Sequence, residues 1–207
     1  MSRLLIIGAG GHGRVVCDAA SLTHRYSEIA FLDDRFGSMD DPFPDHPLIG
    51  RASDAFALSR ETEFIVAIGN NGIRERVMDQ LAQAGLTLAT VIHPAAVIGR
   101  SVTVREGTVI MAGAVVQTGA HIGRGCILNT ASSVDHDDVI GDFTHISVGA
   151  HLCGTVTVGK GCFVCTGSTV INNINVCGGT ILGAGSVTVC DITEPGTYVG
   201  VPARRIR

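Results

Sequence analysis

The sequence predicts two units of different construction: a small α/β domain over residues 1–92 and a parallel β-solenoid over residues 93–191, followed by a tail over residues 192–207. Three observations carry this prediction. Short apolar runs alternate with helix-like segments in the first part of the chain. A six-residue repeat then holds without insertion from residue 96 to residue 191. The chain also has 27 glycines, no Trp and only 4 % aromatic residues, a composition that favours a narrow and repetitive interior.

The first unit shows strands that alternate with helices, the pattern of a parallel sheet with helices packed against it. Apolar runs predict four strands: Leu4–Ile7, Ile29–Leu32, Phe64–Ile68 and Leu86–Ile92. Helical spacing predicts two helices, His12–Leu22 and Asn71–Ala84, with Gly85 placed to end the second. Between Arg35 and Pro47 the chain is rich in Asp and Pro, so we expect a surface loop there.

The second unit is defined by sixteen consecutive hexads that begin at Ala96. Their third residue is aliphatic in fifteen of the sixteen, and their first residue is Ala, Cys, Ser or Thr in twelve. A short fixed period of this kind marks a β-solenoid. Each hexad supplies one strand and one turn, and three hexads make a triangular coil with about 4.8 Å between stacked residues. We expect about five coils, with large third and small first residues inside and glycines in the turns.

Composition and charge exclude several function classes. The net charge of −4 gives no electrostatic basis for binding nucleic acid or an anionic membrane. No stretch approaches the roughly 20 apolar residues that span a bilayer, so we expect no membrane insertion. Seven cysteines without a secretion signal predict reduced thiols in the cytoplasm.

The first predicted strand runs into Gly8-Ala9-Gly10-Gly11-His12-Gly13, which fits the G-x-G-x-x-G pattern of phosphate-binding loops. Glycines let the backbone approach a phosphate at a helix N-terminus, and the acids Asp33 and Asp34 further on suit a ribose hydroxyl. Three interpretations are open: a dinucleotide, a nucleotide sugar, or a structural turn. A dinucleotide needs two mononucleotide-binding halves, and the solenoid begins by residue 96, so we favour the nucleotide sugar.

A second candidate loop is Gly69-Asn70-Asn71, which follows the third predicted strand. The carboxyl ends of parallel strands are where ligands bind in such sheets. The same residues also fit a strand-to-helix turn with an asparagine N-cap. Both interpretations stay open for the asparagines, and Gly69 is compatible with either.

The strongest candidate for chemistry is His136, in the segment Val134-Asp135-His136-Asp137-Asp138. It stands at the fifth hexad position, in a turn and outside the solenoid. Flanking carboxylates stabilise an imidazolium and fix its tautomer, which suits a general base. The alternative is a solvated polar turn. His145 stands at a second position and also points outward, but His121 and His151 do so too, so that position alone is not diagnostic.

Other reactive or charged residues carry weaker signals. Cys162-x-x-Cys165 is only part of a metal site, and the first-position residues Cys126 and Cys162 fit a small buried side chain, so we expect no metal. Arg204 and Arg205 fit either CoA phosphates or a solvated tail.

The motifs GAGGHG, FLDD, IGNN, VDHD and GVPA together resemble the NeuD-like sugar acyltransferases. These include the N-acetyltransferases of UDP-bacillosamine synthesis and the sialic acid O-acetyltransferases. The resemblance covers nearly the whole chain and is closest to enzymes that acetylate the 4-amino group of a UDP-4-amino-4,6-dideoxy sugar. It implies a left-handed β-helix of hexapeptide repeats, acetyl-CoA as co-substrate, and a homotrimer with active sites between neighbouring subunits.

The same resemblance implies roles for individual residues. The family's catalytic histidine matches His136, and its orienting acid, often Glu, matches Asp137 here. Its substrate-contacting asparagine matches Asn129. The remaining contacts to the nucleotide sugar match Gly10, Gly11, His12, Asp33, Asp34 and Gly69. The contacts to acetyl-CoA match His145, Thr166 and Ala184.

The implied activity is acetyl transfer to the sugar amine, with His136 taking the proton, directly or through a water, as the amine attacks the thioester carbonyl. O-acetylation of a sialic acid or related sugar is the first alternative, because the same base serves a hydroxyl. A non-catalytic solenoid scaffold and a zinc-dependent solenoid enzyme of the carbonic-anhydrase type are further alternatives. The acid-flanked turn argues against the scaffold.

Overall fold

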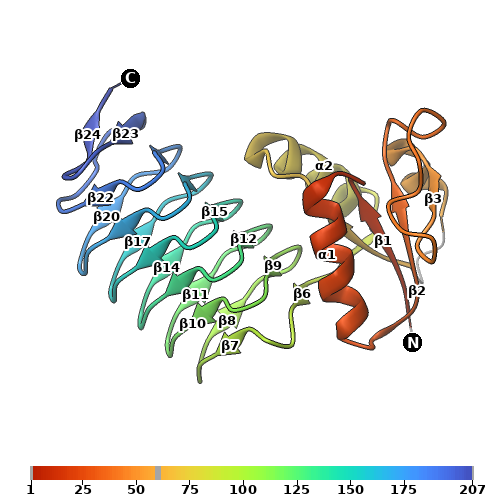
Figure 1. Ribbon diagram of the computed structural model, residues 1–207, viewed down its shortest axis with the longest axis horizontal. Coiled ribbons are helices and arrows are strands. Elements are labelled where there is room, and N and C mark those ends of the chain that lie inside the picture. The colour runs from red at the N-terminus through yellow and green to blue at the C-terminus, as the bar shows by residue number, and fades with distance from the viewer. Residues whose placement is uncertain (1, 59–61, 207) are drawn as a thin grey trace. The chain divides into compact units, whose positions relative to one another are not determined.

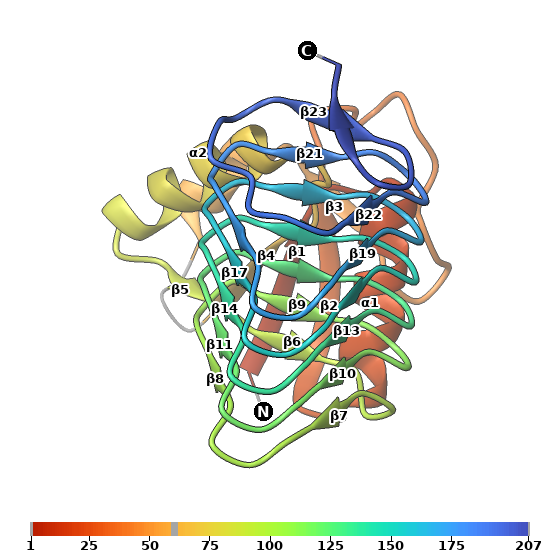
Figure 2. The same cartoon turned by 90° about the vertical axis from the view of Figure 1, so that its left-hand side faces the viewer.

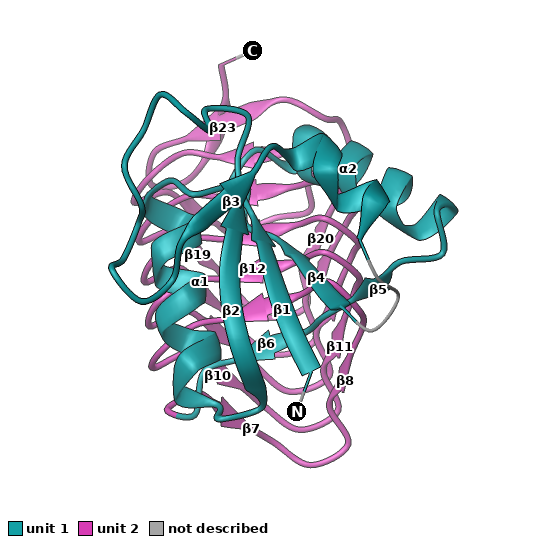
Figure 3. Ribbon diagram, turned by 90° about the vertical axis from the view of Figure 1, so that its right-hand side faces the viewer, with its two compact units in different colours: residues 1–94 teal, residues 95–207 magenta. Residues whose placement is uncertain are grey.

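The computed structural model describes residues 2–58 and 62–206. The chain divides into two compact units, residues 1–94 and residues 95–207, which Figures 1 and 3 show with their elements labelled. Within the described residues, no helix has the length and apolar character needed to cross a bilayer.

The first unit is built on one sheet of five parallel strands in the order β3-β2-β1-β4-β5. Their bounds are β1 Ser2–Ile7, β2 Tyr26–Leu32, β3 Leu48–Gly50, β4 Thr62–Val66 and β5 Thr87–Leu88. This is the strand order of nucleotide-binding α/β folds, and it reverses between β1 and β4. Ligands of such sheets bind beyond the carboxyl ends of the strands at that reversal, which here means the loops after β1 and β4.

Two helices pack against this sheet, and both were predicted to within one residue at each end. Helix α1 (Gly11–Leu22) contacts β1 and β2, and helix α2 (Asn71–Gln83) contacts β4 and β5. Gly85 follows α2 with φ +72°, a left-handed conformation, and the next N–H bonds back to the carbonyl of Leu81. This is the ordinary way for a glycine to end a helix.

Three details of this unit differ from the prediction. The single strand Leu86–Ile92 is wrong: it is two short strands, β5 and β6 (Val91–Ile92), because only Thr87 and Leu88 pair with β4. The predicted loop between residues 35 and 47 is irregular as expected, but β3 and the 3-10 helix η1 (Ala52–Ala57) follow it. A three-residue strand and a six-residue 3-10 helix are too short to show a periodic signal.

The second unit stacks strands of two residues each, one per hexad, into parallel sheets (Figure 2). Their bounds are β7 Val97–Ile98, β8 Thr103–Val104, β9 Val109–Ile110, β10 Val115–Val116, β11 His121–Ile122, β12 Ile127–Leu128, β13 Ser133–Val134, β14 Val139–Ile140, β15 His145–Ile146, β16 His151–Leu152, β17 Thr157–Val158, β18 Phe163–Val164, β19 Thr169–Val170, β20 Asn175–Val176, β21 Ile181–Leu182 and β22 Val187–Thr188. After them, β23 (Thr197–Val199) pairs with β21, and β24 (Arg204–Arg205) pairs antiparallel with β23.

Three faces result from this stacking. Face 1 contains β7, β10, β13, β16, β19 and β22, face 2 contains β8, β11, β14, β17 and β20, and face 3 contains β9, β12, β15, β18, β21 and β23. Paired residues lie 18 apart in sequence, as in Val116 with Val134 and Ile122 with Ile140. Every third-position residue from Ile110 to Leu182 is at most 2 % exposed, which confirms the predicted interior.

The turns obey a rule that the sequence did not reveal. From Ser101 to Gly185, the sixth residue of fifteen consecutive hexads is left-handed, with φ between 55° and 75°. Nine of these residues are glycines, which adopt that region without strain. The other six carry a side chain there: Ser101, Ala131, Asp137, Phe143, Thr155 and Asn173. This region costs most residues about 1–2 kcal/mol, but Asn and Asp tolerate it better. Asp137 of the candidate catalytic turn is one of the two residues of that kind.

Candidate active site

The turn after β13 presents His136 and Asp137 to solvent. Their side chains are 54 % and 67 % exposed, and His136 Nδ1 lies 2.9 Å from Asp137 Oδ2. The backbone N–H of His136 donates to Oδ1 of Asp135 at 2.7 Å, which fixes the peptide that carries the imidazole. The structure thus brings together the two residues that the sequence predicted as base and orienting acid.

The surroundings of His136 favour its protonated form. The hydrogen bond that His136 donates to Asp137 is the main reason that the pKa of His136 lies above its ordinary value, and the charges of Asp135, Asp137 and Asp138 add to it. When Nδ1–H donates to Asp137, Nε2 carries the free lone pair. This arrangement gives a basic nitrogen of defined tautomer that accepts a proton from a substrate.

The imidazole of His136 rests on the backbone of Gly154, which stands at the same corner one coil later. A Cβ on Gly154 would overlap His136 Nε2 and fall 2.6 Å from its Cε1. The N–H of Thr155 also donates to the carbonyl of His136 at 2.9 Å. Sequence reasoning missed Gly154. Its signal is a glycine 18 residues after the histidine, at a fifth position where only Gly178 is another glycine.

Asn129 and His145 meet on face 3. Asn129 Nδ2 lies 3.2 Å from His145 Nε2, and the side-chain Oδ1 of Asn129 accepts the backbone N–H of Thr130. The ring of His145 stacks on that of Phe163, with 4.8 Å between centroids. Although it stands at an outward-pointing position, His145 is only 8 % exposed. The stacked ring and the amide together fix its orientation.

The other two candidates for acetyl-CoA binding lie at the corner that follows face 3. Thr166 and Ala184 are both exposed and stand 18 residues apart at fifth positions. Thr166 Oγ1 lies 3.2 Å from the hydroxyl of Ser147. His136 stands at a different corner, the one that follows face 1. Within one chain the structure therefore groups Asn129, His145, Thr166 and Ala184 along one edge and leaves the candidate base on another.

In the first unit, the glycine loop after β1 has two tightly packed glycines and two open ones. A Cβ on Gly8 would lie 2.9 Å from the Ala67 carbonyl oxygen, and one on Gly13 would overlap the Gly8 carbonyl. These two glycines let α1 and the loop approach β1 and β4. Gly10 is the N-cap of α1 and Gly11 its first residue; a Cβ on Gly10 would meet only Arg35 Nη2, at 3.9 Å, and one on Gly11 would face open space. The loop thus offers backbone N–H groups at a helix N-terminus, a suitable place for an anion.

Asp33 holds this loop in place. Its Oδ2 accepts the N–H of Ala9 at 2.8 Å, and its two oxygens also accept the guanidinium of Arg35, both at 2.8 Å. The paired Arg35 is the main reason that the pKa of Asp33 lies far below its ordinary value. Its oxygens therefore have fewer lone pairs for a ribose hydroxyl than the sequence suggested.

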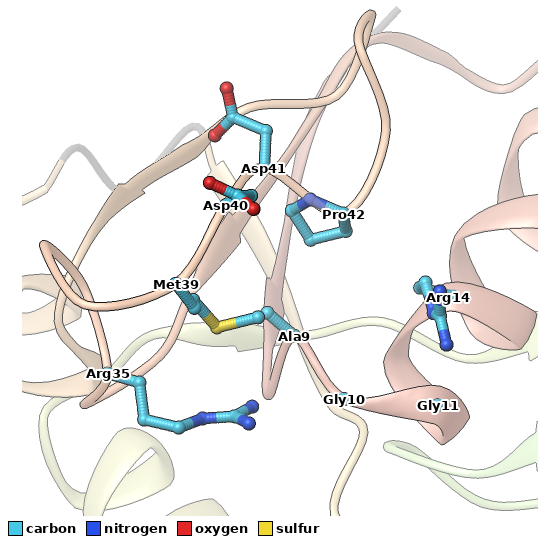
Figure 4. Close-up of a pocket in the computed structure, with 9 residues that line it drawn as sticks. All are labelled: Ala9, Gly10, Gly11, Arg14, Arg35, Met39, Asp40, Asp41 and Pro42. Atoms are coloured by element: carbon cyan, nitrogen blue, oxygen red, sulfur yellow. The ribbon is translucent and has the colours of Figure 1, made fainter.

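A pocket of about 420 Å³ opens beside the loop (Figure 4). Figure 4 shows the side chains of Arg14 and Arg35 on either side of Ala9–Gly11, with Asp40 and Asp41 further along the wall. Two arginines beside helix N–H groups are a typical arrangement for a diphosphate. Neither arginine was predicted, although Arg14 follows Gly10 by one helical turn and Arg35 follows the Asp33-Asp34 pair directly.

His12 and the loop after β4 are held by buried contacts. The pKa of His12 is lowered to about 4, first by burial and then by the charge of Arg74, so its imidazole is neutral near pH 7. The buried Arg74 donates to the carbonyls of Ile68 and Gly69 and to Asn71 Oδ1. Asn70 caps α2 by accepting the N–H of Ile73 at 2.9 Å. The two asparagines thus have structural roles, and Gly69 presents an open backbone.

Asp34 lines a second cavity of the same unit, of about 430 Å³. Its Oδ1 accepts the N–H of Ala52 at 3.3 Å. The apolar side chains of Phe56, Ile73 and Val77 form much of the wall. This combination of an exposed carboxylate and an apolar wall suits a flat heterocycle that carries an N–H donor.

Known proteins resemble this chain along its whole length. The family of the PglD N-terminal domain matches residues 3–81. The acetyltransferase domain of PglB from Neisseria gonorrhoeae, solved in complex with acetyl coenzyme A, is 41 % identical with a TM-score of 0.95, and 99 % of each chain is covered. PerB from Caulobacter crescentus, solved with CoA and GDP-perosamine, is 31 % identical with a TM-score of 0.89 over 99 % of this chain and 97 % of that one.

The chain belongs to the family of acetyltransferases that includes the PglB acetyltransferase domain and PerB. A UDP-N-acetylbacillosamine N-acetyltransferase of Bacillus subtilis is 36 % identical over 113 residues, which are 54 % of this chain and 52 % of that protein. A GDP-perosamine N-acetyltransferase of Escherichia coli O157:H7 is 35 % identical over 95 residues, 46 % of this chain and 43 % of that protein. The matched stretches span about half the length of these two relatives.

The match to the family confirms the predicted fold class, a small Rossmann-like unit followed by a left-handed β-helix of hexapeptide repeats. The solved relatives named above contain acetyl-CoA or CoA. In the described part of this chain, no group of three or more His, Cys, Asp or Glu side chains is arranged to hold a metal ion.

Proposed function

We propose that this protein is an acetyl-CoA-dependent N-acetyltransferase that acts on the 4-amino group of a UDP-linked 4-amino-4,6-dideoxy sugar. The observation that carries the proposal is the His136–Asp137 pair, 2.9 Å apart in an acid-rich turn. It stands on a chain whose whole length matches an acetyltransferase domain solved with acetyl coenzyme A. The relatives that act on UDP- and GDP-linked amino sugars support the substrate class.

His136 is the general base of this reaction. The sugar amine is an ammonium ion in water and loses one proton to solvent before it attacks. Nε2 of His136 accepts a second proton from the nitrogen as the new N–C bond forms at the thioester carbonyl. The C–S bond then breaks, and the CoA thiolate takes this second proton from the imidazolium. Asp137 holds the ring in the tautomer that leaves Nε2 free and strengthens the base.

The first unit binds the nucleotide sugar. The diphosphate lies against the N–H groups of Gly10 and Gly11, between Arg14 and Arg35. Asp33 acts mainly by fixing Ala9 and Arg35. The base of the nucleotide enters the cavity beside Asp34, whose carboxylate accepts an N–H of the heterocycle. His12 and Gly69 complete the site with a neutral imidazole and an open backbone, and Asn129 contacts the sugar.

Acetyl-CoA binds along face 3, where His145, Thr166 and Ala184 lie. Because His136 stands at another corner, one chain does not hold both halves of the acetyl-transfer site. A homotrimer with face-to-face solenoids completes it, with His136 of one subunit directed at His145 of the next. Closed cyclic symmetry is the usual way for such faces to be covered.

An acceptor panel tests the proposed activity. Thiol release from acetyl-CoA is measured with a UDP-4-amino-4,6-dideoxy sugar, a GDP-4-amino sugar and a sialic acid, with His136→Ala as the enzyme control. We expect the highest kcat/KM for the UDP-amino sugar. Turnover with sialic acid and neither amino sugar would favour O-acetylation, the second candidate. If none of the three acceptors raises thiol release above that of the His136→Ala control, the protein is a binding scaffold and not this enzyme.

Subunit exchange tests the trimer. His136→Ala and His145→Ala proteins are each inactive by our account, and mixed trimers regain partial activity because some interfaces carry both histidines. Native mass spectrometry verifies that mixed trimers form. If mixed trimers form and remain inactive, either both histidines act within one subunit or His145 has no role in the site. We also place the enzyme in the cytoplasm, a proposal supported by seven cysteines that are all free thiols.

A further inference from the structure

The coils of the solenoid are joined by a regular ladder of hydrogen bonds. In nearly every hexad, the N–H of the fourth-position residue donates to the third-position carbonyl of the next coil, 17 residues on. Examples are Gln117 to Val134 at 2.9 Å, Asn129 to Ile146 at 2.8 Å and Cys153 to Val170 at 3.0 Å. The same bond is present in the hexads on both sides of the candidate catalytic turn, at Asn129 and at Gly141.

Asp135 departs from this ladder. Its N–H donates to Oδ2 of Asp138 at 2.9 Å, and the described residues contain no hydrogen bond from Asp135 to the carbonyl of Leu152. The strand pairing is reduced at the same place. Strands β13 and β16 are in register at Ser133 and His151 only, whereas the neighbouring pairs on this face have two registered residues. One hydrogen bond of the ladder, that from the Asp135 N–H to the Leu152 carbonyl, is thus missing directly beside His136; we call this position the open rung.

Asp138 holds that rung open from inside the solenoid. It stands at a first position, where most hexads have a small residue, and it is fully buried. While Oδ2 accepts the N–H of Asp135, Oδ1 accepts the N–H of Val156 in the next coil at 2.7 Å. A single carboxylate therefore ties the start of the catalytic turn to the coil beneath it.

Two other first-position residues show why a carboxylate is needed for this. The hydroxyls of Thr108 and Thr144 accept the N–H groups of Cys126 and Cys162, as Asp138 accepts that of Val156. Each hydroxyl also donates its proton to a carbonyl, so its one oxygen serves as the donor of one bond and the acceptor of the other. The two oxygens of the Asp138 carboxylate instead accept two N–H groups at once, one from its own turn and one from the next coil. Burial raises the pKa of Asp138 to about 7, and its two N–H bonds oppose that shift.

We infer that Asp138 is a positioning residue, whose buried carboxylate keeps the Asp135 N–H out of the ladder and so sets the orientation of His136 over Gly154. The inference rests on the proposed role of His136 as general base. Asp135 connects the two, because its N–H is held by Asp138 and its carboxylate accepts the N–H of His136. Without Asp138, the Asp135 N–H is free to rejoin the carbonyl of Leu152, and the turn closes toward the regular geometry.

The test compares Asp138→Asn and Asp138→Ser with Thr108→Ala, a buried first-position variant outside the proposed site. Asn keeps the shape but presents a donor to one of the two N–H groups, and Ser supplies the small residue found in other hexads. We expect both Asp138 variants to fold, to keep KM for acetyl-CoA within twofold, and to lose at least fivefold in kcat. Thr108→Ala keeps wild-type kcat. Wild-type kcat in a folded Asp138→Ser protein would overturn the inference.

A double-mutant cycle separates positioning from general damage. In a His136→Ala background, Asp138→Ser should change the residual rate by less than twofold, since there is no imidazole left to orient. An equal loss in both backgrounds would contradict the inference. If the wild-type protein shows no acetyl transfer at all, the proposed function fails, and NMR still decides on Asp138: the His136 ring resonances must shift in Asp138→Ser and stay unchanged in Thr108→Ala.

Discussion

Hexads Ser132–Asp137 and Ala150–Thr155 occupy the same corner of successive coils, and both end in a left-handed residue, with φ of 60° and 61°. In the second hexad the N–H of Cys153 joins the regular ladder and the fifth residue is Gly154. In the first, the N–H of Asp135 has left the ladder and the fifth residue is His136. The repeat thus supplies a rigid frame, and the candidate chemistry lies where one hexad departs from it.

The largest effect is expected at the third position, which is buried in both hexads, as Val134 and Leu152, and equally in hexad Cys162–Gly167, as Val164. Val134 and Val164 are both fully buried, so Val134→Asp and Val164→Asp place an unpaired carboxylate in the interior at a cost of several kcal/mol. Both variants should fail to fold, as judged by circular dichroism and soluble yield. Cys165→Ser, at a fourth position near a turn, is the tolerated control. Equal thermal stability of all three would show that the hexad register is wrong.

The next effect is specific to Ser132–Asp137, the hexad that departs from the regular ladder and is called the departing hexad below. His136→Ala should fold normally and lose roughly 10²–10⁴-fold in kcat, because the general base is gone. His121→Ala is the matched control, since His121 is an exposed solenoid histidine whose Nδ1 lies 2.7 Å from the hydroxyl of Thr103. Steady-state kinetics on the purified proteins decides. Similar kcat values in the two variants would remove His136 from the mechanism.

A smaller effect is expected from a change in the second hexad at Gly154, the residue that contacts the His136 imidazole of the first hexad. Gly154→Ala displaces the His136 imidazole, because a Cβ there overlaps Nε2. We expect a loss on the order of tenfold in kcat, about 1.4 kcal/mol, with little change in the melting temperature. Gly178→Ala, the other fifth-position glycine, should affect stability more than kcat, since its Cβ meets the Lys160 carbonyl at 3.0 Å. The reverse pattern would show that Gly154 does not seat the base.

The smallest expected effect concerns the turn before the departing hexad. Ala131 is left-handed with φ 55° and carries a side chain that this region disfavours. Ala131→Gly should raise the free energy of unfolding by about 0.5–1 kcal/mol, the strain relieved less the entropy gained by the unfolded chain. Asn173→Gly should gain less, because Asn tolerates the left-handed region. Denaturant titration measures both, and a destabilised Ala131→Gly would contradict the strain argument.

The period of six predicted the solenoid, because it is set by geometry that repeats in every coil. It placed Val134 inside and His136 outside without any knowledge of contacts. The same period does not indicate which N–H leaves the ladder. Asp138 was visible only as a large polar residue at a position that is usually small, and its partners Asp135 and Val156 come from two different coils.

The α/β unit was predictable in a different way. Its glycine motif and the position of Asp33 after a strand indicated a phosphate loop. The partners of Asp33 were not predictable, because a bond such as Asp33–Arg35 depends on the conformation of an irregular loop. The short strand β3 was not predicted, and β5 and β6 were merged into one predicted strand, because two or three residues carry no period.

The most direct test of the account is to measure the pKa of His136 in two ways. NMR titration of the ligand-free protein gives the pKa of the imidazole, and the acidic limb of kcat/KM gives the pKa of the free enzyme's essential base. Only the neutral imidazole accepts a proton, so activity must rise with pH through that pKa. We predict that the two values coincide above the ordinary value of 6.5, and that both fall in Asp137→Asn, which loses the carboxylate that stabilises the imidazolium. An imidazole that titrates without a matching limb in kcat/KM would contradict the assignment of His136 as the base.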